Sequence, residues 1–376
     1  MNVTNKRMRD FSFTSESVTE GHPDKVCDQI SDAILDAYLE QDPYSRCAVE
    51  CLATKDQLVI AGEVSSDGKV NHEELARNVM TDIGYNDAVL GFYSGSRVLD
   101  LIHKQAPQLN AIEGAGDQGF VFGYACNQTK ELMPLPIVLA HKLTKRLAEV
   151  RKQNIIEGLF PDGKSQVTIR YKKNKPVSIE RIIISSHHDE RYRGSDFKVL
   201  KDLIYKEVIL KAIPNNLFTK NTKISVNPNG TWFECGGLAA DTGLTGRKII
   251  ADTYGGWAHH GGGAFSGKDA TKVDRSGAYL ARYLAKTIVE LAYASECEIQ
   301  LGFEIKNNKI ISTNINTFGR ENKTNQISGQ KLYPDDWLNN IQRTIPEIID
   351  FLELRKPIFR DLCNYGHFGK KGYRWE

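Results

Sequence analysis

The chain has 376 residues, of which 40% are hydrophobic and 26% are charged, and its formal net charge is +2. This composition is typical of a folded globular protein and excludes disorder over most of the chain. The balanced charge excludes nucleic-acid binding by bulk positive charge, and no apolar run is long enough to span a membrane. The length predicts two to three domains. The polar segment Met1–Asp10 has no apolar stretch behind it, which predicts a cytoplasmic protein.

The seven cysteines are scattered, with no C-x-x-C pair among them. An odd number at irregular spacing is typical of neither a disulfide framework nor a zinc ribbon. We therefore expect buried, reduced thiols.

Helical and extended patterns alternate irregularly along the chain. Apolar residues recur at helical spacing in 23–41, 73–83, 97–103, 137–152, 196–212 and 274–293. Extended patterns predict strands at 46–54, 57–64, 120–125, 165–171, 177–185, 223–226, 231–235, 297–305 and 310–318. Several strand pairs look like hairpins, so the sequence favours an α+β fold over a doubly wound parallel sheet.

The first predicted hairpin brings two glutamates to one face of a sheet. If Thr54 pairs with Gln57, then Glu50 lies opposite Ala61, and Glu63 lies opposite a residue two positions before Glu50. Two carboxylates on an otherwise apolar face are costly unless a cation compensates them. The alternative is that this face is exposed to solvent.

A glycine-dense stretch from Gly255 to Gly267 precedes Lys268, Lys272 and a predicted helix. Such runs let backbone N–H groups approach a ligand, and lysines at a helix start suit a polyanion. This is not a P-loop, because Asp269 follows the first lysine where that motif needs Ser or Thr. A flexible loop with solvated lysines is the alternative.

Aspartates recur every four residues in the first predicted helix, at Asp24, Asp28, Asp32 and Asp36. We expect a solvated acidic face at Asp32 and Asp36. Asp24 differs, because it follows His22 at the helix entry, where a metal–phosphate pair could dock. Together these features predict an enzyme for a polyphosphate substrate, with a divalent metal and a cationic co-substrate.

Four stretches resemble the S-adenosylmethionine synthetase family: Phe13–Lys25 (FTSESVTEGHPDK), Gly114–Gly119 (GAGDQG), Gly243–Lys248 (GLTGRK) and Gly261–Asp269 (GGGAFSGKD). The resemblance extends from Phe13 to Gly369. It implies three similar α+β domains around a pseudo-threefold axis, approximately 10–108, 109–237 and 238–376. The sheets are expected to be covered by helices on one face and to pack sheet-to-sheet across a subunit interface.

The family makes S-adenosylmethionine from ATP and L-methionine. The resemblance implies attack of the methionine sulfur on C5′ of ATP, then hydrolysis of the bound tripolyphosphate to pyrophosphate and phosphate. It also implies two Mg²⁺ ions per active site, K⁺, and a homodimer with shared active sites that assembles as a dimer of dimers, a homotetramer.

The resemblance assigns roles to individual residues of this sequence. The implied catalytic residues are His22, Lys164, Arg247, Lys268 and Lys272. The implied ATP-binding residues are His22, Asp162, Lys164, Trp232, Phe233, Asp241, Arg247, Lys248, Ala264 and Lys268. The implied methionine-binding residues are Glu63, Gln105, Asp117, Asp241 and Lys272. The implied metal ligands are Asp24 and Asp274 for Mg²⁺ and Glu50 for K⁺.

One segment departs from the family pattern. Only Ala106–Glu113 separate Gln105 from Gly114, whereas most bacterial relatives have a longer segment that closes over the active site. We expect weaker gating as a result. Two other functions remain open: a kinase or ATPase that releases ADP, and a nucleotide-sensing subunit without turnover.

Overall fold

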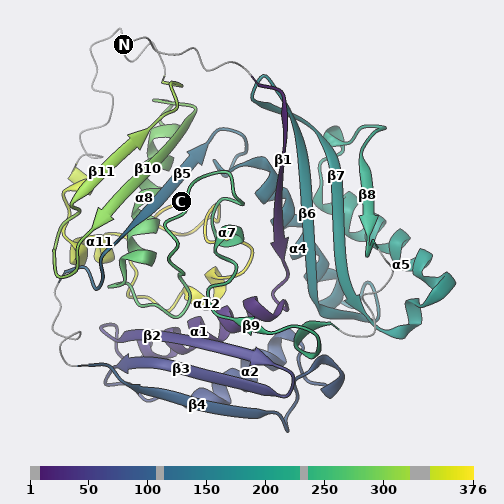
Figure 1. Cartoon of the computed structure of the whole chain (residues 1–376), viewed down its shortest axis with the longest axis horizontal. Coiled ribbons are helices and arrows are strands. Elements are labelled where there is room, and N and C mark those ends of the chain that lie inside the picture. Colours follow the sequence, from purple (N-terminus) through teal and green to yellow (C-terminus); the bar gives the residue numbers. More distant parts are fainter. Residues whose placement is uncertain (1–8, 107–113, 229–235, 322–338) are drawn as a thin grey trace.

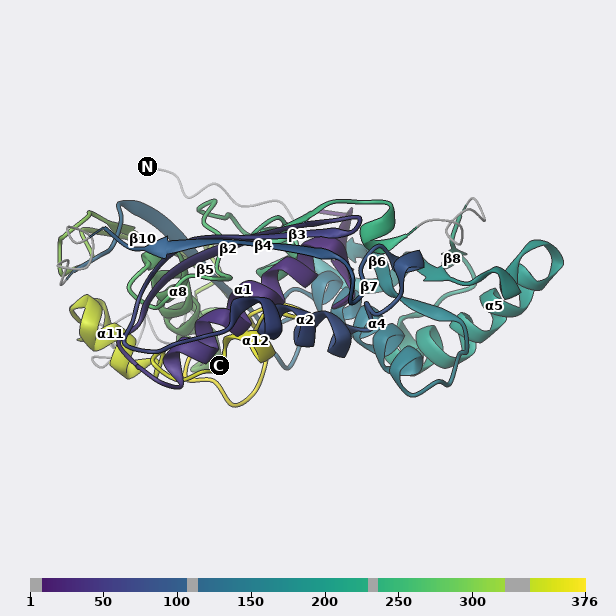
Figure 2. The ribbon, with the colours of Figure 1, turned by 90° about the horizontal axis from the view of Figure 1, so that it is seen from below.

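The computed structural model describes residues 9–106, 114–228, 236–321 and 339–376. Figure 1 shows three β-sheets around a central region, and one long helix packs against each sheet. The helices are α1 (Pro23–Leu39), α4 (Leu135–Lys152) and α8 (Val273–Glu290). Seen from the side, the sheets form one layer and the helices the other (Figure 2). The predicted α+β class with helices on one face of the sheets is confirmed.

Each sheet is built from strands that are distant in the sequence. The first has the order β1-β6-β7-β8, the second β4-β3-β2-β9 and the third β11-β10-β5. The strands are β1 (Phe11–Val18), β2 (Arg46–Thr54), β3 (Gln57–Ser65), β4 (Arg97–Lys104), β5 (Gly119–Cys126), β6 (Leu159–Lys172), β7 (Lys175–His188), β8 (Lys223–Val226), β9 (Gly243–Leu244), β10 (Glu296–Phe303) and β11 (Ser312–Asn316).

The sheets exchange strands across the domain boundaries that the sequence predicts. Strand β1 pairs with β6, β5 pairs with β10, and β9 pairs with β2. Each sheet therefore contains strands from two of the predicted segments, so cutting the chain at the predicted boundaries would divide the sheets. The boundaries 10–108, 109–237 and 238–376 stay a prediction.

Shorter elements complete the described chain. They are α2 (His72–Ile83), η1 (Ala88–Leu90), η2 (Glu190–Tyr192), η3 (Gly194–Asp196), α5 (Phe197–Leu203), η4 (Ile204–Ile209), α6 (Leu210–Ala212), η5 (Asn215–Leu217), η6 (Gly237–Ala239), α7 (Ile249–Asp252), α11 (Ile345–Phe351) and α12 (Phe359–Leu362). None of the helices in the described ranges is long and apolar enough to cross a membrane.

The hairpin of β2 and β3 has the predicted register. Glu50 lies opposite Ala61 and Ala48 opposite Glu63, and Asp56 in the turn adopts a left-handed φ of 57°. Glu50 is exposed, and Leu101 on the neighbouring strand β4 is 51% exposed. This face of the sheet is therefore uncovered in the single chain.

The prediction of a helix at 97–103 is wrong. These residues form β4, which pairs in parallel with β3 along its whole length. Apolar side chains at positions 98, 101 and 102 match helical spacing. An edge strand with half-exposed side chains does not need strict alternation, so periodicity alone misassigns it.

The cysteines inside the described ranges are free and buried, as expected; Cys235 lies outside those ranges. Burial raises the pKa of the Cys27 thiol well above its usual value. Such thiols are inert at neutral pH.

Candidate active site

His22 caps the N-terminus of α1 with its side chain. The backbone N–H of Asp24 donates to Nδ1 of His22 at 3.2 Å, which leaves the ring proton of the neutral form on Nε2. The ring is buried, and its pKa is lowered to about 3, first by burial and then by the charges of Lys248 and Lys164. His22 is therefore a neutral hydrogen-bond donor at physiological pH.

Asp24 ties the helix entry to the loop that follows β9. Its carboxylate accepts the N–H of Leu244 at 2.9 Å and forms a close ion pair with Lys248. Burial opposes the charge of Asp24, but the hydrogen bonds from Lys248 and Leu244 hold its pKa below the usual value. An anionic carboxylate and a lysine thus stand together beside His22.

The next two aspartates of α1 position two loops. Asp28 accepts the N–H of Gly246 at 2.8 Å, directly before Arg247 and Lys248. Asp32 accepts the N–H of Gly267 at 2.8 Å, and both of its carboxylate oxygens accept from Nη2 of Arg275 at 2.9 Å. One helix face therefore fixes the backbone beside both predicted groups of phosphate-binding residues.

The predicted solvated face at Asp32 and Asp36 is wrong. Asp32 is fully buried, and Asp36 accepts the N–H groups of Phe359 and Arg360 at 3.0 and 2.8 Å. Spacing places the four carboxylates on one face but does not say what packs against that face. Their partners lie more than 200 residues away, so the sequence carried no local signal for these positioning residues.

Asp162 and Lys164 lie in β6, close to His22. Asp162 is buried and accepts the N–H of Gly237 at 3.1 Å through one carboxylate oxygen. The other oxygen has no partner within the described residues. Burial, with the charge of Asp241, raises the pKa of Asp162 to about 6, against the opposing effects of the Gly237 N–H and Lys164.

A second group of charged residues surrounds the start of α8. Lys268 pairs with Asp274 at 2.6 Å, and Lys272 pairs with Asp269 at 2.5 Å. Burial opposes the charge of Asp269, but Lys272 and hydrogen bonds from Thr271 lower its pKa. The lysines after the glycine run are held by carboxylates, contrary to the alternative of solvated lysines.

The glycine run packs closely against its surroundings. A Cβ at Gly267, where φ is +78°, would lie 1.8 Å from the carbonyl oxygen of Val49. A Cβ at Gly263 would lie 2.2 Å from a carboxylate oxygen of Asp274, and one at Gly246 would lie 2.4 Å from Cβ of Ala264. Glycine is needed here because the loop touches β2, α8 and the loop of Arg247.

Of the residues predicted for methionine, Glu63, Gln105 and Asp117 lie on segments that contact this second group, whereas Asp241 acts on Asp162 beside His22. Glu63 lies opposite Ala48 in the hairpin, and Ala48 makes an isolated bridge to Lys268. The backbone N–H of Gln105 donates to the carbonyl of Val64 near the end of β3. The side-chain oxygen of Gln105 is buried and has no hydrogen-bond partner in the described part of the chain.

Asp117 belongs to the segment beside Lys272. Its carboxylate accepts the N–H of Gln118 at 2.7 Å, and the preceding Gly116 donates to the carbonyl of Thr271 at 3.1 Å. A carboxylate oxygen of Glu63 lies 3.4 Å from Nε2 of His103.

The predicted site residues thus form two groups, which we call the His22 group (His22, Asp24, Asp162, Lys164, Asp241, Arg247 and Lys248) and the Lys268 group (Glu63, Gln105, Asp117, Ala264, Lys268, Lys272 and Asp274). Over the ranges that the structure describes, no hydrogen bond or ion pair joins side chains of the two groups. Glu50 lies on the exposed sheet face, on the same side of the hairpin as Glu63, and belongs to neither group. Trp232, Phe233 and residues 107–113 lie outside the described residues.

The donor set fits Mg²⁺ only together with phosphate oxygens. The described residues contain no group of three or more His, Cys, Asp or Glu side chains that could hold a metal. Mg²⁺ is commonly bound by one or two carboxylates plus substrate phosphates. Asp24 and Asp274, each a single carboxylate paired with a lysine, match that arrangement.

Comparison with known proteins identifies the family. Residues 10–107, 112–232 and 235–376 match the N-terminal, central and C-terminal domains of S-adenosylmethionine synthetase. The chain belongs to the S-adenosylmethionine synthetase family. The predicted family and enzyme class are confirmed.

Two relatives of this family are each named S-adenosylmethionine synthase. The protein of Sorangium cellulosum is 46% identical over 380 residues, which cover 98% of this chain and 88% of the relative. The protein of Petrotoga mobilis is 47% identical over 404 residues, which cover 98% of this chain and 96% of the relative.

Proposed function

We propose that this enzyme forms S-adenosylmethionine by attack of the methionine sulfur on C5′ of ATP, with the whole triphosphate as leaving group. The observation that carries the proposal is the buried, neutral His22 at the start of α1, with Lys164 and Lys248 close enough to lower its pKa. Cations with a neutral N–H donor at a helix N-terminus suit a departing polyphosphate.

The chemistry explains why the site holds many cations and needs no general base. A thioether sulfur is neutral and carries no proton, so catalysis consists of positioning and of stabilising charge on the leaving group. His22 donates Nε2–H to a phosphate oxygen beside the breaking C5′–O bond. Lys164, Arg247 and Lys248 neutralise the phosphate chain from the same side.

The Lys268 group completes the proposed site. Lys268 and Lys272 bind the phosphate chain, and Ala264 lines the nucleotide site. Trp232 and Phe233 stack on adenine, and Asp162 and Asp241 contact the nucleotide. Glu63, Gln105, Asp117, Asp241 and Lys272 bind methionine. Glu63 and Asp117 attract its ammonium group, since a carboxylate favours a nearby cation.

We further propose that the bound tripolyphosphate is hydrolysed to pyrophosphate and phosphate. Asp24 and Asp274 would each hold one Mg²⁺ ion and Glu50 would hold K⁺, so that bound cations would complete the charge balance. Metal supplies neutralisation of the phosphate oxygens. On binding, Lys248 and Lys268 exchange their carboxylate partners for phosphate oxygens, which frees Asp24 and Asp274 for metal.

A homodimer with shared active sites is the proposed assembly, and a dimer of dimers the proposed tetramer. Support comes from the two groups themselves, because no hydrogen bond or ion pair among the described residues joins side chains of the His22 group to side chains of the Lys268 group. The uncovered face of β2, β3 and β4, with Leu101 51% exposed, is the proposed contact. The free, buried cysteines support a cytoplasmic location.

One product analysis tests the reaction. Purified enzyme receives ATP, methionine, Mg²⁺ and K⁺, and mass spectrometry identifies the products. The expected products are S-adenosylmethionine, pyrophosphate and phosphate, with neither ADP nor AMP. Formation of ADP would support a kinase or ATPase instead. ATP that binds but stays intact would support a regulatory subunit.

A further inference from the structure

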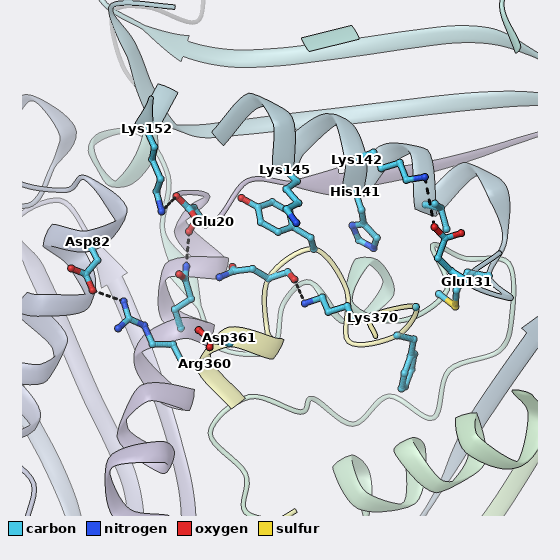
Figure 3. Close-up of a pocket in the computed structure, with 17 residues that line it drawn as sticks. Glu20, Asp82, Glu131, His141, Lys142, Lys145, Lys152, Arg360, Asp361 and Lys370 are labelled. Atoms are coloured by element: carbon cyan, nitrogen blue, oxygen red, sulfur yellow. Dashed lines mark hydrogen bonds and ion pairs between the residues drawn. The ribbon is translucent and has the colours of Figure 1, made fainter. Parts of the chain in front are cut away.

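A cavity of about 700 Å³ lies apart from both groups of site residues. Its walls come from α1, α2, α4 and the C-terminal segment (Figure 3). A cavity of this size holds a small organic molecule. None of the residues assigned above to ATP, methionine or metal lines it.

Most charges around this cavity are already paired. Lys152 pairs with Glu20 at 2.6 Å, Arg360 with Asp82 at 2.8 Å, and Lys142 with Glu131 at 3.7 Å. These pairs stand at the sides of the cavity in Figure 3. Within each pair the two opposite charges compensate each other, so these residues carry no net charge to a ligand in the middle of the cavity.

Two ammonium groups remain without a carboxylate among the described residues. Lys145 extends from α4, and Lys370 extends from the C-terminal segment opposite (Figure 3). Lys370 donates to the backbone carbonyls of Leu362, at 2.7 Å, and Asn364. Burial, with the charges of Lys25 and Lys145, lowers the pKa of Lys370 to about 8, against the opposing effects of Cys363 and Asp252. An anion between Lys145 and Lys370 would relieve this repulsion.

Unsatisfied polar groups lie in the same wall. Nε2 of His141 and the hydroxyl of Tyr365 are buried and have no hydrogen-bond partner within the described ranges. His141 is 8% exposed, and Nδ1 of its ring is held by Ser17 at 2.8 Å. Buried polar groups without partners are rare, but both atoms are closed to the surface of the cavity, so the contacts proposed for a ligand come from Lys145 and Lys370.

The remaining wall sets the kind of anion. Met133, Val138 and Phe368 give it an apolar part, while the exposed carboxylate of Asp361 stands at the rim. An apolar wall favours an organic body, and the rim carboxylate disfavours a multiply charged ligand. We propose that this cavity binds a small organic monoanion, with its carboxylate-type head between Lys145 and Lys370 and its apolar body against Met133 and Phe368.

The test uses 4-iodobenzoate as the probe and 4-iodobenzamide, its uncharged analogue, as the control. Titration calorimetry of the full-length enzyme should show binding of the benzoate alone. Lys145→Met should weaken that binding about tenfold, as expected for loss of one charge-assisted contact. Lys198→Met removes an exposed lysine of α5 and should change nothing.

Crystals soaked with 4-iodobenzoate locate the site by the anomalous scattering of iodine. We expect iodine near Met133 and Phe368, and its loss in Lys370→Met. Iodine only elsewhere, or binding at crystal concentration only, overturns the proposal. Equal affinity for the benzamide, or unchanged affinity in Lys145→Met, also overturns it. Since Lys370→Met could unfold the C-terminal segment, the Lys145→Met result decides by itself.

Discussion

Single residues in the His22 group owe their chemistry to burial and to close opposite charges. His22 stays neutral because it is buried near Lys164 and Lys248. Asp24 stays charged because Lys248 and Leu244 bind it. Side chains of ordinary type thus acquire fixed protonation states from their positions, which suits a reaction without proton transfer to or from the nucleophile.

Replacement of Lys164 by Met should remove most activity and leave the fold intact. A methionine of similar length cannot neutralise the departing phosphate, so kcat should fall by roughly 10²–10³. Steady-state assays with S-adenosylmethionine detection measure the loss, and circular dichroism checks the fold. Lys175→Met, at the start of the neighbouring strand β7, is the matched control. Full activity of Lys164→Met would refute the proposed role.

Asp162 should make the protein less stable as pH rises. Its folded pKa is raised to about 6 from the ordinary 3.8, so the folded state binds the proton more tightly. The contribution of Asp162 to folding is therefore most favourable below about pH 4, is lost as pH rises from about 4 to 6, and stays lost above.

Asp162→Asn should remove this dependence. In urea unfolding between pH 4 and 7, the stability of the variant relative to wild type should rise with pH. Asp67→Asn, which changes an exposed carboxylate, is the control. A difference that stays constant, or falls, over this range would contradict the assignment of the raised pKa to Asp162.

Helix α1 acts as an organising element for the proposed site. Its buried aspartates hold the backbone at Gly246 and Gly267, which lie next to the cations of the two groups. The fold therefore positions two loops from one rigid helix, and the loops touch each other at Gly246 and Ala264.

Asp32→Asn should destabilise this arrangement strongly. It leaves Arg275 buried with an uncompensated charge, since neither partner is exposed, and such a loss costs about 3–5 kcal/mol. Urea unfolding measures the change. The single variants Asp32→Leu and Arg275→Met each leave one charge buried without its partner. The double variant leaves none, so its loss in free energy of unfolding should be smaller than the sum of the losses of these two single variants. Strict additivity would argue against the ion pair.

At the scale of the whole molecule, one layer of sheets lies over one layer of helices (Figure 2). The helices cover one side, and the face that carries Glu50 and Leu101 stays uncovered in the single chain. Apolar residues on an open sheet face are typical of an interface between subunits. If this face forms the proposed dimer contact, loss of the contact would also disassemble the shared active sites.

Leu101→Asp should dissociate the assembly and abolish activity. A carboxylate in an apolar sheet contact is desolvated without a partner, so association should weaken by more than tenfold. Light scattering after size exclusion measures the mass, and the product assay measures turnover. Val199→Asp on α5 is a matched control, since Val199 and Leu101 are each 51% exposed. An active monomer would refute the shared site.

Local features of the sequence determined much of this protein. The hairpin register at Glu50 and Glu63 followed from a two-residue turn, and the start of α1 followed from His22 and Pro23. The glycine run predicted a loop whose backbone can approach a ligand, and only the structure showed that its glycines pack closely against β2 and α8. Motifs in four stretches indicated the family. These signals are readable because their causes lie within a few residues of one another.

Tertiary structure decided what the aspartates of α1 do and where the strands pair. Asp28 and Asp32 bind segments more than 200 residues away, so periodicity placed them on one face but could not tell burial from exposure. The edge position of β4 and the exchange of β1, β5 and β9 between sheets also depend on contacts between segments distant in the sequence. Such contacts form only in the folded chain, and they decide which side chains are buried and which carboxylates find a partner for their charge.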